Sequence, residues 1–226
     1  VVREATAGDV KSVHAAIENV GLKEVWLKIA GGEKACVIDN VIAKQQPKLI
    51  LEFGTYVGYT STRMALQVDA WGGRVVTMEM DPVNATIARN HVEMAGLSHV
   101  VTVQLGHSDD AVQMVLDKFG PRSVDMVFMD QRGTAFHDDL RNLEQLNLMA
   151  ENAVVIADNV LKPGAPYHVW RISTLPHYAT DIIDLREFGS APVEDWMTVS
   201  WVRLGPSYGQ LPNEVRQLNE LARESD

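Results

Sequence analysis

The sequence has a single cysteine, Cys36, among its 226 residues. One thiol cannot form an internal disulfide or a cysteine-rich zinc site, so the fold must depend on its hydrophobic core. A chain of this length can bury a core large enough to do so. Because disulfides are absent, we expect a reducing compartment and predict a cytoplasmic protein.

Long apolar runs are also missing. No stretch approaches the ~18 apolar residues that a membrane-spanning helix requires. The first ten residues, VVREATAGDV, lack the basic segment followed by an apolar one that marks a secretory signal. We therefore expect no membrane segment in this chain.

Positive charge is scarce. The chain has 20 Lys and Arg against 30 Asp and Glu, a net charge of -10. Nucleic-acid binding needs concentrated basic side chains, and no basic stripe interleaved with aromatic residues is present. We expect no nucleic-acid partner and favour a small neutral or cationic molecule.

What the sequence does have is a regular alternation of apolar runs and helical patterns. Apolar runs typical of buried strands occur at 48–53, 73–80, 100–105, 124–130 and 153–158. Helical patterns follow at 59–68, 81–96, 108–119 and roughly 137–149. In the second of these, Asp81 is expected to cap the helix, Pro82 to occupy its first turn and Gly96 to end it. His91 of the same helix is expected on the exposed surface. This order predicts a mostly parallel sheet with helices on both faces.

The two ends of the chain depart from this alternation. Residues 9–20 and 34–44 predict two helices before the first strand, and residues 1–46 are expected to cover the site. Residues 179–188 and 194–204 predict two longer strands at an antiparallel edge. Residues 213–226 predict a short helix or a frayed end, and we expect 209–226 to be flexible. With no repeat or linker, we expect 1–226 to form one domain.

Ligands of open parallel sheets bind beyond the carboxyl ends of the strands, where this sequence is polar. In LEFGTYVGYTS, Gly54 and Gly58 permit a tight turn and close approach of a ligand. The spacing fits neither the dinucleotide fingerprint nor a phosphate-binding loop. Glu79, at the end of the next strand, could accept hydrogen bonds from both hydroxyls of a ribose. A structural turn and a solvated carboxylate are the alternatives. A nucleoside without pyrophosphate, such as S-adenosylmethionine (SAM), explains both features.

A second group follows the fourth and fifth strands. Asp130, Asp158 and Asn159 should meet if these strands are neighbours. Two carboxylates and an amide carbonyl are hard oxygen ligands that suit Mg²⁺. The alternative is that Asp158 and Asn159 only cap the turn before KPGAP.

Taken together, LEFGTYVGYTSTRMA, VVTMEMDP, VDMVFMD and VIADNVLKPGAP resemble the catechol O-methyltransferase family in order and spacing. The resemblance runs from about Glu24 to the C-terminal strands. It implies a Rossmann-like class I methyltransferase fold with a seven-stranded, mostly parallel sheet. It also implies Mg²⁺-dependent transfer of a methyl group from SAM to a hydroxyl of a catechol or related phenol. The family is commonly monomeric, so a monomer is expected.

The resemblance also implies roles for individual residues. Cofactor binding is expected from Ala30, Glu52, Gly54, Tyr56, Thr60, Glu79, Met80, Ser108, Asp109, Asp130 and Gln131. Asp130, Asp158 and Asn159 match the metal ligands. Substrate binding is expected from Trp26, Lys28, Arg132, Asn159, Pro163 and Asp195.

Three positions depart from the family pattern. Gln131, Arg132 and Gly133 stand where well-studied members have His, Trp and a Lys that takes the phenolic proton, although one divergent branch also has Arg and lacks the Lys. Asp195 replaces a longer acid that anchors the second catechol hydroxyl, and Lys28 replaces a Met of the pocket wall. Glycine cannot act as a base, so His137, Lys28 or water would accept the proton.

Other functions compete with this interpretation. A cofactor-binding pseudoenzyme with little turnover would fit the missing lysine. A methyltransferase for a different hydroxylated substrate is also open. Methylation of a hydroxylated tRNA base is disfavoured by the acidic charge, and a nicotinamide oxidoreductase by the glycine spacing.

Overall fold

A computed structural model describes residues 1, 3–25, 27–189, 193–203 and 212–225. The chain divides into two compact units, one made of residues 1–107 and 186–194 and the other of residues 108–185 and 195–226. The expectation of a single domain stays a prediction. None of the helices in the described ranges is long and apolar enough to cross a membrane.

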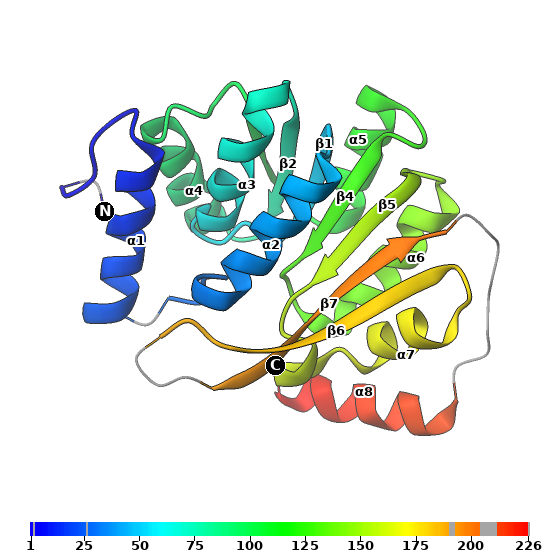
Figure 1. The fold of residues 1–226 in the computed structure, drawn as a ribbon. Coiled ribbons are helices and arrows are strands. Elements are labelled where there is room, and N and C mark those ends of the chain that lie inside the picture. The colour runs from blue at the N-terminus through cyan, green and yellow to red at the C-terminus, as the bar shows by residue number, and fades with distance from the viewer. Residues whose placement is uncertain (2, 26, 190–192, 204–211, 226) are drawn as a thin grey trace. The chain divides into compact units, whose positions relative to one another are not determined.

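The first unit holds three parallel strands and the helices that pack on them (Figure 1). Its elements are α1 Val10–Lys23, α2 Gly32–Gln45, β1 Leu49–Phe53, α3 Tyr59–Val68, the 3-10 turn Asp69–Trp71, β2 Arg74–Glu79, α4 Pro82–Met94 and β3 Val101–Leu105. The strand order is β3-β2-β1, with Leu51 paired to Val76 and Thr77 to Val103. All five residues of β1 are buried, as expected for a strand covered on both faces.

The start of α4 shows how the sequence specifies its own boundaries. The Asp81 side chain accepts hydrogen bonds from the backbone N–H groups of Val83 and Asn84, and Pro82 occupies the first turn. Gly96 follows the helix with φ +74°, a conformation that glycine adopts without strain. These predictions are confirmed. The expected exposure of His91 is wrong, because its ring is buried and Nδ1 donates to the Val57 carbonyl at 2.8 Å.

The second unit combines parallel strands with an antiparallel edge. Its elements are α5 Ser108–Phe119, β4 Val124–Met129, the 3-10 turn Gly133–Ala135, α6 Phe136–Gln145, β5 Met149–Ala157, the turn Val160–Gly164, α7 Pro166–Thr174, β6 Tyr178–Arg186, β7 Glu194–Val202 and α8 Asn213–Ser225. The strand order is β4-β5-β7-β6. β4 and β5 are parallel, whereas β7 is antiparallel to β5.

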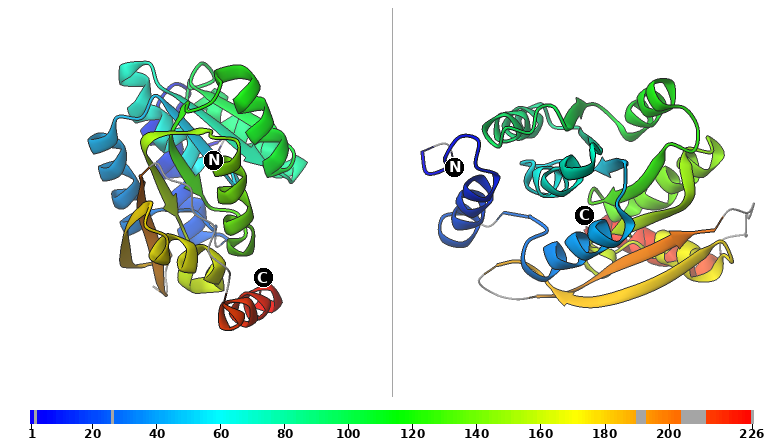
Figure 2. Two further views of the ribbon diagram at one scale, coloured as in Figure 1. Left: turned by 90° about the vertical axis from the view of Figure 1, so that its right-hand side faces the viewer. Right: turned by 45° about the horizontal axis from the view of Figure 1, so that its top comes forward.

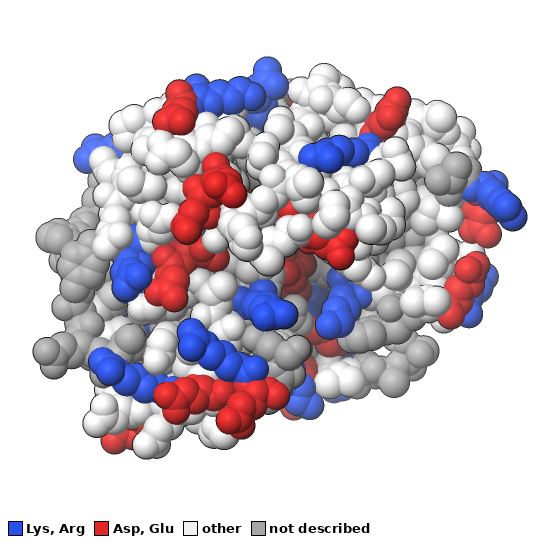
Figure 3. Space-filling view, turned by 180° about the vertical axis from the view of Figure 1, so that it is seen from behind, with Lys and Arg blue, Asp and Glu red and all other residues white. Residues whose placement is uncertain are grey.

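The sequence predicted the seven strands and the antiparallel edge, and the structure confirms both. One boundary is wrong: α6 ends at Gln145, and β5 begins at Met149 instead of 153. Residues 213–225 are helical and lie along α7 in the views of Figures 1 and 2, while the expected flexible residues 209–211 lie outside the described ranges. On the face seen in Figure 3, acidic and basic side chains are interspersed.

Candidate functional site

The glycine turn after β1 is held in place by Glu79. The backbone N–H of Tyr56 donates to Glu79 Oε2 at 2.8 Å, and the N–H of Asp81 donates to Oε1 at 2.9 Å. Gly54 and Gly58 have φ of +93° and +79°, and Tyr56 itself has φ +47°. A carboxylate oxygen can accept more than one hydrogen bond, so Glu79 keeps acceptor capacity for ribose hydroxyls. Its structural role and its predicted ligand role are compatible.

Glycine is needed at position 58 for a second reason. A Cβ atom there would lie 3.2 Å from the backbone and side chain of Ala88 in α4. The turn is therefore pressed against a helix, and the chain enters α3 directly after it. Thr55 and Thr77 reinforce the turn through a 2.6 Å hydrogen bond between their hydroxyls.

Glu52 is a fully buried acid near the end of β1. Ser61 donates to its Oε2, whereas Oε1 has no hydrogen-bond partner within the described part of the chain. Burial raises the pKa of Glu52 to about 7, and the nearby charge of Glu79 adds to the increase. A buried oxygen without a donor is costly, so this atom is suited to a ligand that brings a donor or a positive charge.

The remaining predicted cofactor and substrate residues of the first unit differ in exposure. Thr60 and Ala30 are buried, Lys28 is exposed, and Met80 is 65% exposed at the carboxyl end of β2. The contact of Met80 with the adenine, which the family resemblance implies, stays a prediction. The prediction for Trp26 falls outside the described residues.

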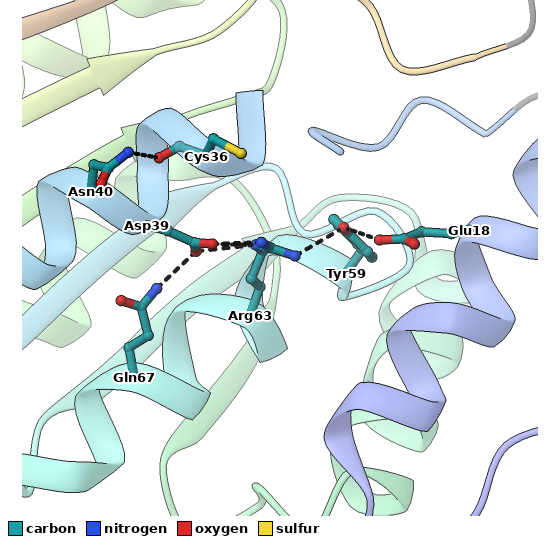
Figure 4. A network of polar contacts seen from close by, with 7 residues as sticks. All are labelled: Glu18, Cys36, Asp39, Asn40, Tyr59, Arg63 and Gln67. Atoms are coloured by element: carbon teal, nitrogen blue, oxygen red, sulfur yellow. Dashed lines mark hydrogen bonds and ion pairs between the residues drawn. The ribbon is translucent and has the colours of Figure 1, made fainter. Parts of the chain in front are cut away.

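A polar network connects the N-terminal helices to the start of α3. Figure 4 shows Arg63 between Asp39 of α2, with which it forms an ion pair, and the hydroxyl of Tyr59, which donates to Glu18 of α1. Gln67 donates to the same aspartate at 2.8 Å. The network fixes both helices to the helix that follows the glycine turn. Sequence analysis missed it, because its members are spread over three helices.

In the second unit, strand register brings the predicted metal ligands together. Met129 pairs with Ala157, and the N–H of Asp158 donates to the Met129 carbonyl at 2.9 Å. The next residues, Asp130 and Asp158, therefore lie side by side where the two parallel strands end. Asn159 follows in a left-handed conformation, with its N–H donating to Asp158 Oδ1 at 2.7 Å.

This donor set fits a hard divalent cation. It contains two carboxylates and one amide on adjacent chain segments, all oxygen donors of the kind that Mg²⁺ prefers. The described residues contain no group of three or more His, Cys, Asp or Glu side chains that could hold a metal ion. Two acids and an amide do not make such a group, so this finding does not bear on the predicted set.

Asp195 lies at the start of β7 and is fully buried. Its Oδ2 accepts from the Asn159 side-chain amide at 2.9 Å, and its Oδ1 accepts from the Lys162 N–H at 3.1 Å. The structure therefore places this residue against a predicted metal ligand. Its expected contact with a substrate hydroxyl stays a prediction.

Gln131 follows Asp130 and is oriented by a residue that the sequence did not single out. Its Nε2 donates to Asp139 Oδ2 at 2.7 Å, while its Oε1 is buried and has no partner among the described residues. Asp109, at the start of α5, accepts from Asn142 at 3.0 Å. Gln131 thus offers a fixed carbonyl oxygen, which is suited to the amino group of a base. Ser108 is half-buried at the same end of α5.

The loop after β4 explains why position 133 is glycine. A Cβ atom at Gly133 would lie 2.5 Å from the Gly164 carbonyl oxygen and 3.1 Å from the Ala165 Cβ. No real Cβ atom comes that close to a backbone oxygen, so this position has no room for a side chain. Arg132 and Pro163 are both exposed.

His137 is 6% exposed on α6, with its ring packed edge-on against Tyr167 at 5.4 Å between centroids. Burial lowers its pKa, and the charge of Arg171 lowers it further. Its Nδ1 has no hydrogen-bond partner in the described residues. A neutral imidazole with an open nitrogen can accept a proton, but the deep packing restricts access. Its role as a base stays a prediction.

Sequence analysis also missed a buried ionic cluster in the second unit. Glu144 of α6 accepts hydrogen bonds from Arg171 of α7 and from the Tyr178 hydroxyl of β6. All three side chains are largely buried. The ion pair between Arg171 and Glu144 compensates for the hydration that each of these two charges loses. The cluster joins helices to the sheet and lies outside the predicted site. No spacing in the sequence signals it.

The seven-stranded sheet, with parallel strands and an antiparallel edge, defines an α/β protein with polar residues at its strand ends, and comparison with known proteins gives its family. The family model described as O-methyltransferase matches residues 11–169. The bovine catechol O-methyltransferase is 40% identical over 166 residues, which cover 74% of this chain and 61% of the bovine protein. The porcine catechol O-methyltransferase is 38% identical over 60% of this chain and 73% of that protein. The chain belongs to the O-methyltransferase family and is related to its catechol O-methyltransferases.

The match spans less than two thirds of the length of the bovine relative. A human transmembrane O-methyltransferase is 30% identical over 74% of this chain and 57% of that protein. Among solved structures, an O-methyltransferase from Bacillus cereus in complex with SAH has a TM-score of 0.70 and 24% identity, covering 86% of this chain and 89% of that one. This likeness confirms the predicted methyltransferase fold.

Proposed function

We propose that this chain transfers the methyl group of SAM to a hydroxyl of a catechol-type substrate, with Mg²⁺ bound by Asp130, Asp158 and Asn159. One observation supports the proposal: the β4–β5 register makes Asp130 and Asp158 neighbours along the backbone, with Asn159 next, in a chain related to catechol O-methyltransferases. A disused site has no physical need of three oxygen donors at neighbouring strand ends.

The residues of the first unit fit the cofactor. Glu79 would accept hydrogen bonds from the ribose hydroxyls, and the open turn at Gly54 and Tyr56 allows close approach of the methionine part. Oε1 of Glu52, which has no hydrogen-bond partner among the described residues, would receive a donor or positive charge there. In the second unit, the fixed Oε1 of Gln131 would accept from the adenine. When bound, SAM supplies a methyl group activated by its positively charged sulfur.

The protein contributes mainly by positioning. Bound Mg²⁺ would lower the pKa of a substrate hydroxyl and orient it. Methyl transfer is a direct displacement, so the chain needs no nucleophile of its own, and correct alignment supplies much of the rate. Lys28 in the first unit and Arg132 in the second are both exposed, and each would offer the substrate a polar contact.

The hydroxyl proton must leave without the lysine that the family resemblance implies. General-base catalysis is typically worth about 10²–10⁴-fold, so its loss would slow turnover without abolishing it. His137, Lys28 and water remain the acceptors that we propose. Changing His137 to Ala should flatten the pH dependence of turnover near neutrality if this imidazole is the base. An unchanged profile would remove it from consideration.

The first test is methyl transfer from SAM to a simple catechol, with Mg²⁺ compared with excess EDTA. Metal-dependent product would support the reaction and show that Gly133 is compatible with turnover. Product formation that is unaffected by EDTA would refute the role of the metal.

The lack of room for a side chain at Gly133 favours one second candidate function, a binding protein that retains the cofactor site and has little turnover. Catechol binding that requires Mg²⁺, measured by calorimetry, with no methylated product after long incubation, would favour it. Two further expectations stay predictions: that the chain is a monomer and that it acts in the cytoplasm. Size-exclusion chromatography with light scattering would test the oligomeric state.

A further inference from the structure

The position of Asp195 follows from the register of the antiparallel edge. Ala157 of β5 pairs with Thr198 of β7. β5 ends at Ala157, and hydrogen bonds from the Asn159 side chain and the Lys162 N–H show that the segment after it lies against Asp195. The acid therefore lies beside the turn that carries Asn159 at one end and Lys162 further on. No residue of the turn has to reach far to contact it.

The hydrogen bonds define how Asn159 is oriented. An ionised carboxylate accepts hydrogen bonds and donates none, so only the amide nitrogen of Asn159 can face Asp195 Oδ2. A flipped amide would place its carbonyl oxygen against a carboxylate oxygen, which is repulsive. The carbonyl oxygen of Asn159 consequently occupies the opposite edge of the amide. This is the atom that a divalent cation would select.

The second oxygen of Asp195 has a related task. It accepts from the Lys162 N–H at 3.1 Å and thereby fixes the turn Val160–Gly164 relative to β7. A fully buried carboxylate is costly unless it is hydrogen-bonded, and these two donors supply that compensation. One acid thus holds both the side chain of Asn159 and the backbone that follows it.

We propose that Asp195 is a positioning residue for the metal site, because it fixes the Asn159 amide with the nitrogen facing Asp195 and the carbonyl oxygen, the predicted metal ligand, directed away from it. The inference rests on the proposed function, since it presupposes that Asn159 is a metal ligand. It gives Asp195 a different task from the substrate contact that the family resemblance implies. Partners of this kind, which orient a metal ligand, typically contribute 10- to 100-fold in metal affinity.

Mn²⁺ binding to the full chain tests the proposal without any turnover. Electron paramagnetic resonance reports free Mn²⁺, so a titration gives Kd directly. Asp195→Asn has a single acceptor oxygen for two donors, and we expect its Kd for Mn²⁺ to rise about 10- to 100-fold. Asp184→Asn, an exposed position on β6 with the same charge change, is the matched control and should bind as the wild type does.

The reciprocal exchange Asn159→Asp with Asp195→Asn provides a rescue. The new Asn at 195 would donate to the new carboxylate at 159 and still accept from the Lys162 N–H, so both hydrogen bonds persist. We expect Mn²⁺ affinity to recover in the double variant and not in Asp195→Asn alone. Thermal unfolding in EDTA checks that each variant folds, and the double variant remains informative where the single one is unstable.

The outcomes separate the two claims. Wild-type affinity in a folded Asp195→Asn variant, with a raised KM for catechol, would overturn the positioning role and favour substrate contact. Failure of the exchange to restore affinity would also overturn it. Absence of Mn²⁺ binding by the wild type, with and without S-adenosylhomocysteine, would overturn the proposed metal dependence and this inference with it.

Discussion

Gly133→Ala tests the closeness of packing in the loop after β4. The added Cβ would lie 2.5 Å from the Gly164 carbonyl oxygen, whereas carbon atoms in favourable contact are typically about 3.5–4.0 Å apart. Because the opposing atom belongs to the backbone, it cannot rotate away as a side chain could. The loop or the turn Val160–Gly164 must therefore shift by about 1 Å.

Overpacking of this kind costs about 1–3 kcal/mol. Replacing glycine by alanine also restricts the unfolded chain, which returns about 0.4–1 kcal/mol. We expect the free energy of unfolding to fall by about 1–2 kcal/mol. In a chain of this length that corresponds to a Tm lower by roughly 2–4 °C per kcal/mol. Thermal unfolding followed by circular dichroism in EDTA would measure it.

Gly21→Ala is the matched control, because the new Cβ would lie 3.5 Å from Leu27 Cβ, an ordinary contact, on helix α1. Alanine is the better helix former, so this variant should be as stable as the wild type or more so. Equal stability of the Gly133 and Gly21 variants would refute the packing argument. Gly133→Lys would then destabilise the loop and would not restore the base that the family resemblance implies at this position.

Three further predictions concern charge. Glu79→Gln should raise the Kd for SAM about 10- to 100-fold, measured by calorimetry. The substitution removes the charged acceptor of the ribose hydrogen bonds and sets an amide donor against the N–H of Tyr56 or Asp81. Unchanged affinity would contradict the ribose role. The pKa of His14 is lowered to about 4 by burial, so the unfolded state binds the proton first as pH falls. Relative to His14→Gln, the wild type should lose about 2 kcal/mol between pH 7.5 and pH 5 in urea unfolding, and parallel curves would refute this. The pKa of Glu52 is raised to about 7, so the folded state keeps a proton that the unfolded state loses. The stability of the wild type should fall by about 3 kcal/mol from pH 4.5 to pH 7 relative to Glu52→Gln, and an identical pH dependence of the two proteins would count against it.

The strand-end residues could be predicted because a parallel sheet leaves little choice. Apolar runs fix where β4 and β5 end, and the next residues must then be neighbours. For this reason Asp130 and Asp158 were placed correctly beside each other from sequence alone. The turn at Gly54 and its glycines were predictable on the same grounds.

Contacts between distant segments were not predictable. Gly133 looked like the loss of a base, and only the approach of Gly164 shows that the loop requires glycine. His91 looked exposed because a helical pattern does not reveal a hydrogen bond to a turn 34 residues away. The hydrogen bond between Asp195 and Asn159 joins residues 36 positions apart, with a helix and a strand between them. In each case the signal is tertiary and leaves no local pattern.

The carboxylate of Glu79 is already fixed by two backbone N–H groups before any ligand arrives. The side chain of Glu79 loses its conformational entropy during folding, so a ribose that binds it need not immobilise a flexible acid. The proposed ribose acceptor is therefore preorganised, and complex formation should require little rearrangement at this end of β2. With the proposed ribose contact, one carboxylate would maintain both the fold of the glycine turn and the affinity for the nucleoside, so no substitution of Glu79 could change one without the other.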